Sequence, residues 1–297
     1  MWVGELNLNP IDLPDVQSSP STQKFKLTRV GVTGVKKLVY IKRPGKKKAM
    51  SLVVKMDLFV DLPASQKGSH MSRNLELISE NNDRHGVKTF TDLETFCAET
   101  AKLLLKKHEY ATLSEVKAEA DYFLERTYPS GNKGLEPFKL VAEARANNKN
   151  EIKKLIGVKV IGMTACPCAR EVIKTIGKYK NIPPTHNQRN VTTLMIEVPG
   201  DDKSVDANDL IDIAERSFSS PTYGILKRKE EGKLVFDAHK NPKFVEDVVR
   251  DILGEILQNY KNLPDDVLVV VRSESEESIH KHNAFAERAT TLGELRK

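Results

Sequence analysis

The sequence has little of several features on which other classes of protein depend. Three cysteines in 297 residues are too few for a disulfide scaffold, and a reducing cytosol would keep them as thiols. No apolar run approaches the roughly 20 residues that a membrane helix needs. Residues 1–23 hold no basic segment followed by an apolar run, so we expect no secretory signal and a cytoplasmic location. Hydrophobic content of 39% and charged content of 30% indicate a globular protein rather than a disordered one.

The formal net charge of +6 is a moderate excess that is spread along the chain. It is compatible with an anionic small molecule, with a nucleic acid, or with no anionic partner. Residues 36–48, KKLVYIKRPGKKK, hold seven Lys or Arg and make nucleic-acid binding one hypothesis. Between residues 36 and 63 only Tyr40 and Phe59 could stack on bases, which is a poor platform for a single strand.

Hydrophobic patterning predicts an α+β protein whose two halves follow a similar plan. Residues 1–23 form an extended lead-in, and residues 24–150 and 151–297 each form a unit. The first unit should begin with a hairpin of residues 24–42 and 50–63, followed by a polar loop at 61–73. A helix should start at Thr91 or Asp92, and two strands should follow at 114–124 and 137–146. The second unit should begin with two strands, at residues 156–163 and 190–200. One helix should start at Asp206 or Asn208 and another should lie within 241–260, and a final strand should start at residue 267.

The segment GMTACPCA places Cys166 and Cys168 on the two sides of one proline. One intervening residue is too few for both to bind one tetrahedral ion easily, since most structural zinc sites have two or more. The pattern fits one cysteine as a metal ligand, with positions left open for water, or two small residues buried in a turn. A thiol redox sensor is a further hypothesis. Cys97 lies on the apolar face of the predicted helix and should belong to the core.

Three other titratable positions have both a functional and a structural explanation. His186 begins the run His-Asn-Gln-Arg in the same segment as the cysteines, which favours metal binding over a solvated loop position. Glu277 and His280 follow the last predicted strand and would share a face only on a helix, so a charged sheet edge is the simpler interpretation. Glu246 lies in the first turn of a predicted helix, where the helix dipole alone favours a carboxylate.

Seven blocks in order resemble those of the type IB GTP cyclohydrolases, and they are VGVTGVKK, DLPASQKGSHMSR, GMTACPCA, THNQRN, YGILKRKEE, NPKFVEDVVRD and ESIHKHNAFA. GMTACPCA and the long gap to HNQR resemble the archaeal branch, the GTP cyclohydrolase of methanopterin biosynthesis. The resemblance covers residues 28 to 288 or so. It implies the tunnelling fold, in which antiparallel sheets backed by helices form two units per chain. Subunits of that fold associate edge to edge into a barrel, with active sites at their interfaces.

The resemblance also implies roles for individual residues. Those that match metal ligands are Cys166, His186 and Glu231, although Lys-Glu-Glu replaces the family's Pro-Asp-Glu and leaves Glu230 as an alternative to Glu231. Those that match substrate or catalytic positions are Glu246 for the purine, Glu277 and His280 as a pair that binds metal or shuttles protons, Cys168 for assistance in proton transfer, and Lys67, Arg73 and Arg189 for the phosphates. The implied metal is one Fe²⁺ per subunit, with Zn²⁺ or Mn²⁺ as alternatives.

The implied reaction opens the imidazole ring of GTP at C8, releases formate and closes a 7,8-dihydroneopterin phosphate. In the archaeal branch this product is the 2′,3′-cyclic phosphate. The implied partners are GTP and further copies of the chain, in a dimer or tetramer, without a membrane or a nucleic acid. The alternative enzyme is a nitrile reductase of the same fold, which acts on a 7-deazaguanine with NADPH and a cysteine nucleophile.

Overall fold

A computed structural model describes residues 14–42, 48–83, 89–200 and 204–297. The tip of the basic hairpin, residues 43–47, and residues 1–13 of the lead-in lie outside the described residues. The strands are β1 (Leu27–Ile41), β2 (Met50–Leu62), β3 (Thr89–Phe90), β4 (Leu113–Thr127), β5 (Lys133–Asn147), β6 (Ile152–Ala165), β7 (Asn187–Glu197), β8 (Ser220–Pro221), β9 (Leu268–Glu276) and β10 (Ala284–Thr291). The helices are α1 (Met71–Asp83), α2 (Leu93–Lys107), α3 (Pro167–Gly177), α4 (Ala207–Ser217), α5 (Arg228–Lys240), α6 (Val245–Asn259) and α7 (Leu292–Leu295).

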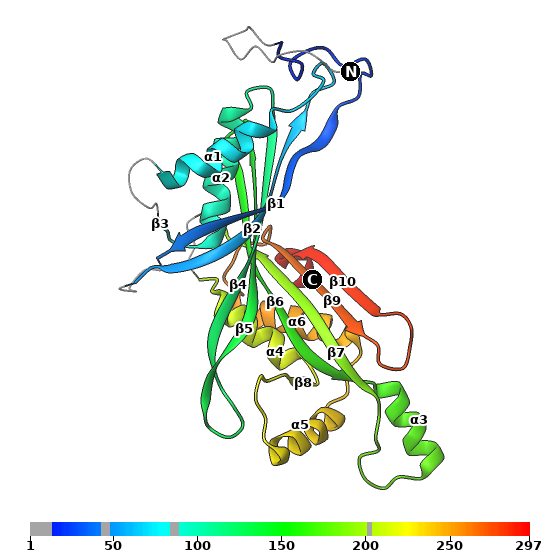
Figure 1. Cartoon of the computed structure of the whole chain (residues 1–297). Helices are drawn as coiled ribbons and strands as arrows, with labels where there is room; N and C mark the ends of the chain where they lie inside the picture. The colour runs from blue at the N-terminus through cyan, green and yellow to red at the C-terminus, as the bar shows by residue number, and fades with distance from the viewer. Residues whose placement is uncertain (1–13, 43–47, 84–88, 201–203) are drawn as a thin grey trace, which may run out of the picture.

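All the described strands join one sheet, which confirms the predicted α+β class (Figure 1). Its order is β10-β9-β7-β6-β5-β4-β2-β1-β3, with β8 paired to β6 beside this path. Every neighbouring pair is antiparallel except β1 and the short β3, which are parallel. β5 pairs with β6 over eight residue pairs, from Lys139 with Lys159 to Ala146 with Ile152. The expected division into units at residues 150 and 151 therefore falls at a turn inside a continuous sheet.

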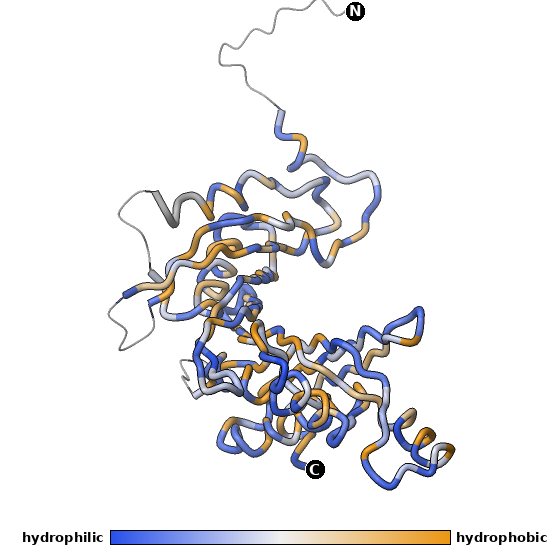
Figure 2. Tube along the Cα trace, turned by 60° about the horizontal axis from the view of Figure 1, so that its bottom comes forward, coloured by the Kyte–Doolittle hydropathy of each residue, from blue (hydrophilic) through white to orange (hydrophobic). Residues whose placement is uncertain are grey.

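One face of the sheet is apolar because alternate residues of each strand point to the same side. Figure 2 shows this alternation of hydrophobic and hydrophilic positions along the strands. Helix α2 covers β4, β5 and β6 on this face, and α4 and α6 cover the β6, β9 and β10 side. A single row of buried side chains crosses both halves of the molecule, and its members are Met56, Ala118, Ala142, Ile156, Ile196 and Val269.

Local sequence signals set the boundaries of two helices as predicted. Asp92 begins α2, and its side chain accepts a hydrogen bond of 2.8 Å from the backbone N–H of Thr95. Asp206 begins α4 and accepts one of 2.7 Å from Asn208. Each carboxylate satisfies a donor that the first turn of a helix leaves free. Cys97 is fully buried on α2, which confirms its place in the core.

Four helices and three strands of the described residues have no counterpart in the sequence interpretation. The polar loop predicted at 61–73 is wrong at its end, because α1 starts at Met71. The turn considered for the CPC segment is wrong, because Pro167 is the first residue of α3, a position where proline loses no hydrogen bond. The other additions are helices α5 and α7 and strands β3, β8 and β10. None of the described helices combines the length and the apolar character that crossing a bilayer demands.

Candidate active site

The end of β6 holds Cys166 beside His186. Cys166 is the N-cap of α3, and its Sγ accepts a hydrogen bond of 3.4 Å from the backbone N–H of Ala169. Its own backbone N–H donates to the carbonyl oxygen of His186 at 3.0 Å. The hydroxyl of Thr185 donates to the Cys166 carbonyl at 2.7 Å. These two bonds join the exit of β6 to the entry of β7, so the backbones of a cysteine and a histidine 20 positions apart in the chain become neighbours.

Gln188 connects His186 with Glu277. The Nδ1 of His186 lies 3.0 Å from Gln188 Oε1, and Gln188 Nε2 donates to Glu277 Oε1 at 3.2 Å. Because a carbonyl oxygen only accepts, Nδ1 carries the proton and donates. The same tautomer leaves Nε2 of His186 with a free lone pair, as a metal-binding imidazole requires. Glu277 Oε2 also lies 3.8 Å from His186 Nδ1.

Two further histidines follow β9 on the same side. The ring of His280 lies 6.5 Å from that of His186, centroid to centroid, and almost perpendicular to it. His282 stacks on His280 at 5.1 Å. Glu277 and His280 lie in the connection between β9 and β10, outside either strand, so the question of a shared strand face does not arise. The structure thus brings the predicted Cys166, His186, Glu277 and His280 to one end of the sheet.

A buried polar layer lies under this end and holds three strands in register. Asn190 on β7 donates to Ser275 on β9 at 2.9 Å and accepts from Ser273 at 2.8 Å and from Thr192 at 2.9 Å. Ser275 also lies 3.2 Å from Thr164 on β6. All five side chains are closed to solvent, and each is hydrogen-bonded. Such a satisfied network fixes the positions of the strand ends from which Cys166, His186 and Glu277 project.

The N-terminus of α6 approaches the same place. The backbone N–H of Lys243 donates to the carbonyl of Ala165, the residue before Cys166, at 3.0 Å. Lys243 is further held by Asp251 at 2.7 Å and by the carbonyl of Ser217 at 3.0 Å. Glu246 follows in the first turn of α6 and is exposed. The backbone of the predicted purine-binding residue, Glu246, therefore lies near that of Cys166, and the Glu246 side chain is open to solvent.

The other candidates near this end are more exposed. Cys168 lies on the first turn of α3 with its thiol free. Arg189 is exposed on β7, opposite Met163 on one side and Glu276 on the other. Arg189 shares neither face nor burial with Gln188, because successive strand residues point to opposite sides of the sheet.

The structure does not bring Glu231 to the Cys166 and His186 pair. Glu231 is exposed in the first turn of α5, and only the far end of that helix reaches this region, where His239 Nε2 lies 3.0 Å from the carbonyl of Thr185. Eight residues of helix between them span about 12 Å. Its alternative, Glu230, caps α5 by accepting from the backbone N–H of Lys227 at 2.7 Å. Among the described residues no group of three or more His, Cys, Asp or Glu is close enough to hold a metal ion.

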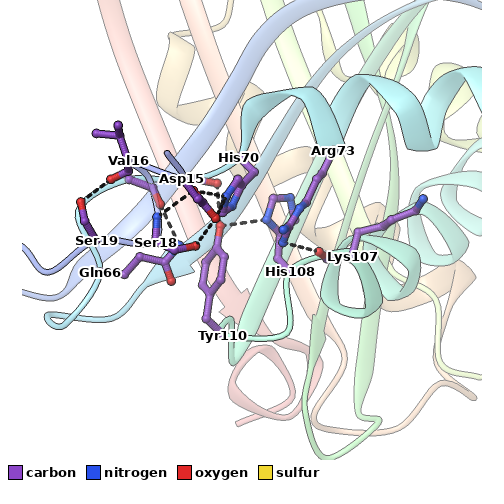
Figure 3. A network of polar contacts seen from close by, with 12 residues as sticks. Asp15, Val16, Ser18, Ser19, Gln66, His70, Arg73, Lys107, His108 and Tyr110 are labelled. Carbon is purple, nitrogen blue, oxygen red and sulfur yellow. Dashed lines mark hydrogen bonds and ion pairs between the residues drawn. The ribbon is translucent and has the colours of Figure 1, made fainter. Parts of the chain in front are cut away.

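Lys67 and Arg73 lie in the other half of the chain, and Figure 3 shows Arg73 beside Lys107 and His108. Arg73 on α1 donates to the carbonyl of Lys107 at the end of α2, at 3.1 Å, which favours that helix terminus. Lys67 is exposed, and its backbone N–H binds the carbonyl of Ser19 in the lead-in. Between β2, which leads to them, and β7 there are four strand spacings, or about 19 Å. Within one chain these cations are therefore remote from His186.

A histidine network surrounds Arg73. His108 is fully buried, with Nε2 at 2.6 Å from Asn74 Oδ1 and Nδ1 at 2.8 Å from the hydroxyl of Tyr110. Burial, followed by the positive charges of Arg73 and His70, lowers the pKa of His108 to about 4. His70 Nε2 binds the carboxylate of Asp15 at 2.9 Å, which fastens the lead-in to the loop before α1.

Sequence reasoning assigned no role to Gln188 or His282, although both have a signal in the sequence. Gln188 stands two residues after His186 and therefore on the same side of a strand that starts at residue 187. His282 stands two residues after His280. Their relevance depends on the approach of β9 to β7, which no local pattern contains.

These elements first define a fold class. The structure is similar to a uricase from Bacillus fastidious with a TM-score of 0.50 at 10% sequence identity, over 93% of this chain and 96% of that one. The architecture is therefore that of the tunnelling fold, with helices on one face of a large antiparallel sheet, as predicted. A likeness at this identity shows the fold alone.

The family follows from the sequence comparisons. The profile of the type I GTP cyclohydrolase FolE2 family matches residues 13–286. The chain is 44% identical to the GTP cyclohydrolase MptA of Methanobrevibacter smithii, over 96% of this chain and 97% of that protein. It is also 44% identical to the GTP cyclohydrolase MptA of Methanothermobacter thermautotrophicus, over 95% of each. The chain belongs to the type I GTP cyclohydrolase FolE2 family, which is a family of enzymes, as the resemblance of the seven blocks indicated.

Proposed function

We propose that this protein is a GTP cyclohydrolase of methanopterin biosynthesis. It would convert GTP into a 7,8-dihydroneopterin phosphate, the 2′,3′-cyclic phosphate, with release of formate. The family and the two relatives named GTP cyclohydrolase MptA support the substrate and the reaction class. The observation that carries the proposal is the meeting of Cys166, His186 and Glu277 beside the N-terminus of α6. No observation favours the nitrile reductase, the redox sensor or the nucleic-acid-binding hypothesis over it.

Cys166 and His186 are the residues that would hold the divalent ion, for which we propose Fe²⁺. The free Nε2 lone pair of His186 and the partly buried thiol of Cys166 fit an ion that accepts mixed sulfur and nitrogen ligands. Glu277 is the carboxylate that stands beside them, and Glu231 would need to be brought closer to serve. The bound ion would supply Lewis acidity, which lowers the pKa of water toward neutrality.

The remaining residues would bind GTP and move protons. Glu246 can accept hydrogen bonds from N1 and from the exocyclic amine of guanine, a paired match that adenine lacks. His280 can donate a proton to N7, which makes C8 more electrophilic, and Cys168 can assist that transfer. Glu277 holds the amide of Gln188 and, through it, the orientation of His186. Arg189 is the phosphate partner on the same half of the chain.

A second copy of the chain would complete the site. Lys67 and Arg73, the other two expected phosphate partners, lie on the far half of the sheet from His186. An edge-to-edge assembly, as the tunnelling fold implies, would bring the first half of one copy to the second half of another. Two inactive variants, Lys67→Ala and Cys166→Ala, would then regain part of the activity when refolded together. Retention of full activity by a dilute monomer would contradict this arrangement.

The ligand role of Cys166 is tested by metal content and turnover. Reduced wild-type protein loaded with Fe²⁺ without oxygen should release formate and a pterin from GTP, and a chelator should stop the reaction until Fe²⁺ is returned. Cys166→Ala should lose both the metal and the turnover. Cys97→Ala is the matched control, because that thiol is buried under α2, and it should keep its metal. A fully active Cys166→Ala protein without metal would refute the ligand role.

The purine-binding role of Glu246 has a control on the same helix. Glu246→Gln keeps the shape of the side chain but presents an amide N–H to guanine, so GTP affinity should fall by on the order of 10- to 100-fold while metal content stays unchanged. Glu255→Gln removes a carboxylate that pairs with Arg216 at the surface, and it should bind GTP normally. An unchanged GTP affinity in Glu246→Gln would remove this residue from the pocket.

A further inference from the structure

Arg170 is the charged residue nearest to Cys166 on α3, and its side chain has no partner. Neither a hydrogen bond nor an ion pair joins its guanidinium to any other part of the described chain. Its Nε is nevertheless shut off from solvent. By contrast, Lys174, one turn further along the same helix, is paired with Glu171 at 3.4 Å.

The position of Arg170 directs its side chain toward the candidate active site. Residues four apart on a helix are neighbours, and the backbone N–H of Arg170 bonds to the carbonyl of Cys166 at 3.3 Å. Helical side chains lean toward the N-terminus of their helix, so a long side chain at 170 extends over the turn that begins at Cys166. Helix α3 projects from the end of the sheet and has no buried residue (Figure 1). The Nε of Arg170 is thus buried although no residue of the helix itself is, and the turn that this side chain overlies is the one that begins at Cys166.

A buried guanidinium N–H without an acceptor is unfavourable, and it remains charged at every physiological pH. The described residues offer it no carboxylate. The sulfur of Cys166 is not its acceptor either, since that atom is bonded to the N–H of Ala169. An oxygen anion brought by a ligand would satisfy both the charge and the donors, and the planar fork of arginine suits phosphate oxygens in particular.

We propose that Arg170 binds a phosphate group of the nucleotide substrate at the Cys166 end of the site. This inference rests on the proposed function, since it takes GTP as the ligand. It adds a phosphate partner from the same half of the chain as His186, whereas Lys67 and Arg73 are remote. The phosphates would then lie across the first turn of α3, where the N-terminal end of the helix also favours an anion.

The test measures equilibrium binding of 8-oxo-GTP and of 8-oxo-guanosine by calorimetry to the metal-loaded protein. C8 of these compounds already carries oxygen, so no ring opening follows binding. Arg170→Met should weaken 8-oxo-GTP binding by on the order of 10- to 100-fold and leave 8-oxo-guanosine binding unchanged. Arg170→Lys should recover part of the loss, because it keeps the charge without the fork. Lys174→Met is the matched control and should change neither affinity.

Two results would overturn the assignment of Arg170 alone, and a third would overturn the proposed function as well. Equal weakening of both compounds would show that Arg170 only supports the fold or contacts the base, and no weakening of either would show that it lies outside the site. In both cases a wild-type protein that releases formate from GTP would leave the proposed function standing. A wild-type protein that neither binds 8-oxo-GTP nor releases formate would overturn the proposed function and this inference together.

Discussion

Two titratable groups, the buried His108 and the partly buried Glu215, should give this protein opposite dependences of stability on pH. Burial, ahead of the charges of Arg73 and His70, lowers the pKa of His108 to about 4 from 6.5. Burial raises the pKa of Glu215 to about 7 from 4.5, against the pull of Arg126, whose Nη2 lies 2.8 Å from its carboxylate. His108 lies under α1 and α2 in the first half of the chain, and Glu215 on α4 in the second, so they titrate independently.

The direction of each contribution follows from the sign of its shift. His108 contributes stability that is present above pH 6.5 and is lost as the pH falls through about 4. Glu215 contributes stability that is present below pH 4.5 and is lost as the pH rises through about 7. At about 1.4 kcal/mol for each pH unit, either shift is worth about 3 kcal/mol. Between pH 4.5 and 6.5 the His108 contribution rises with pH about as fast as the Glu215 contribution falls, so the two changes nearly cancel in the wild type.

Single substitutions should expose the two contributions separately. In Glu215→Gln, Arg126 keeps its ion pair with Asp212, and the free energy of unfolding relative to wild type should rise by about 3 kcal/mol between pH 4.5 and 7. In His108→Asn, the same difference should fall by about 3 kcal/mol between pH 4 and 6.5. Urea unfolding followed by circular dichroism at half-unit pH steps measures both. A difference from wild type that does not vary with pH in either variant would refute the reasoning for that residue.

Three further substitutions test packing and charge. Gly162→Ala would place a Cβ 2.0 Å from Cδ2 of the buried Phe218, so it should lower the free energy of unfolding by about 1–3 kcal/mol, as measured in urea. An unchanged free energy of unfolding would mean that the Phe218 ring moves aside without cost. Gly232→Ala on α5 meets nothing within 4 Å and should instead stabilise the protein by about 0.5–1 kcal/mol, seen as a higher urea midpoint. Asp61 has a pKa of about 2 instead of 3.8, because hydrogen bonds from Thr112 and an ion pair with Lys26 outweigh the raising effect of burial. Its contribution is present above pH 3.8 and is lost as the pH falls through about 2, so the instability of Asp61→Asn relative to wild type should be constant from pH 5 to 7 and shrink in acid. If the free energy of unfolding fell with decreasing pH in the same way in Asp61→Asn and in the wild type, this prediction would be contradicted.

The sequence predicts those parts of the fold that bury an apolar face. Strands β2, β4 and β5 alternate in burial, and α2, α4 and α6 carry apolar stripes, so their periodicity is visible without a structure. Helix α3 has no buried residue and α5 has only Ala238, so neither shows a core-facing stripe. Their formation depends on local effects, such as Pro167 at the first position of α3, which the sequence shows only weakly.

The candidate site divides in the same way. Cys166, His186 and Glu277 were found through residue type and through the resemblance to a family, and the structure places them together. Gln188 became recognisable as the connection between His186 and Glu277 only when β9 was placed beside β7. The orphan Nε of Arg170 is a property of packing, and no spacing in the sequence reveals it.

The ladder between β5 and β6 has a practical consequence for anyone who tries to dissect this chain. A gene cut between codons 150 and 151 would leave each fragment with a long exposed edge strand, β5 in one and β6 in the other, whose backbone N–H and C=O groups are unpaired. Exposed edge strands of this kind promote aggregation. The two fragments should therefore be insoluble when expressed apart and should recover only when they are produced in the same cell.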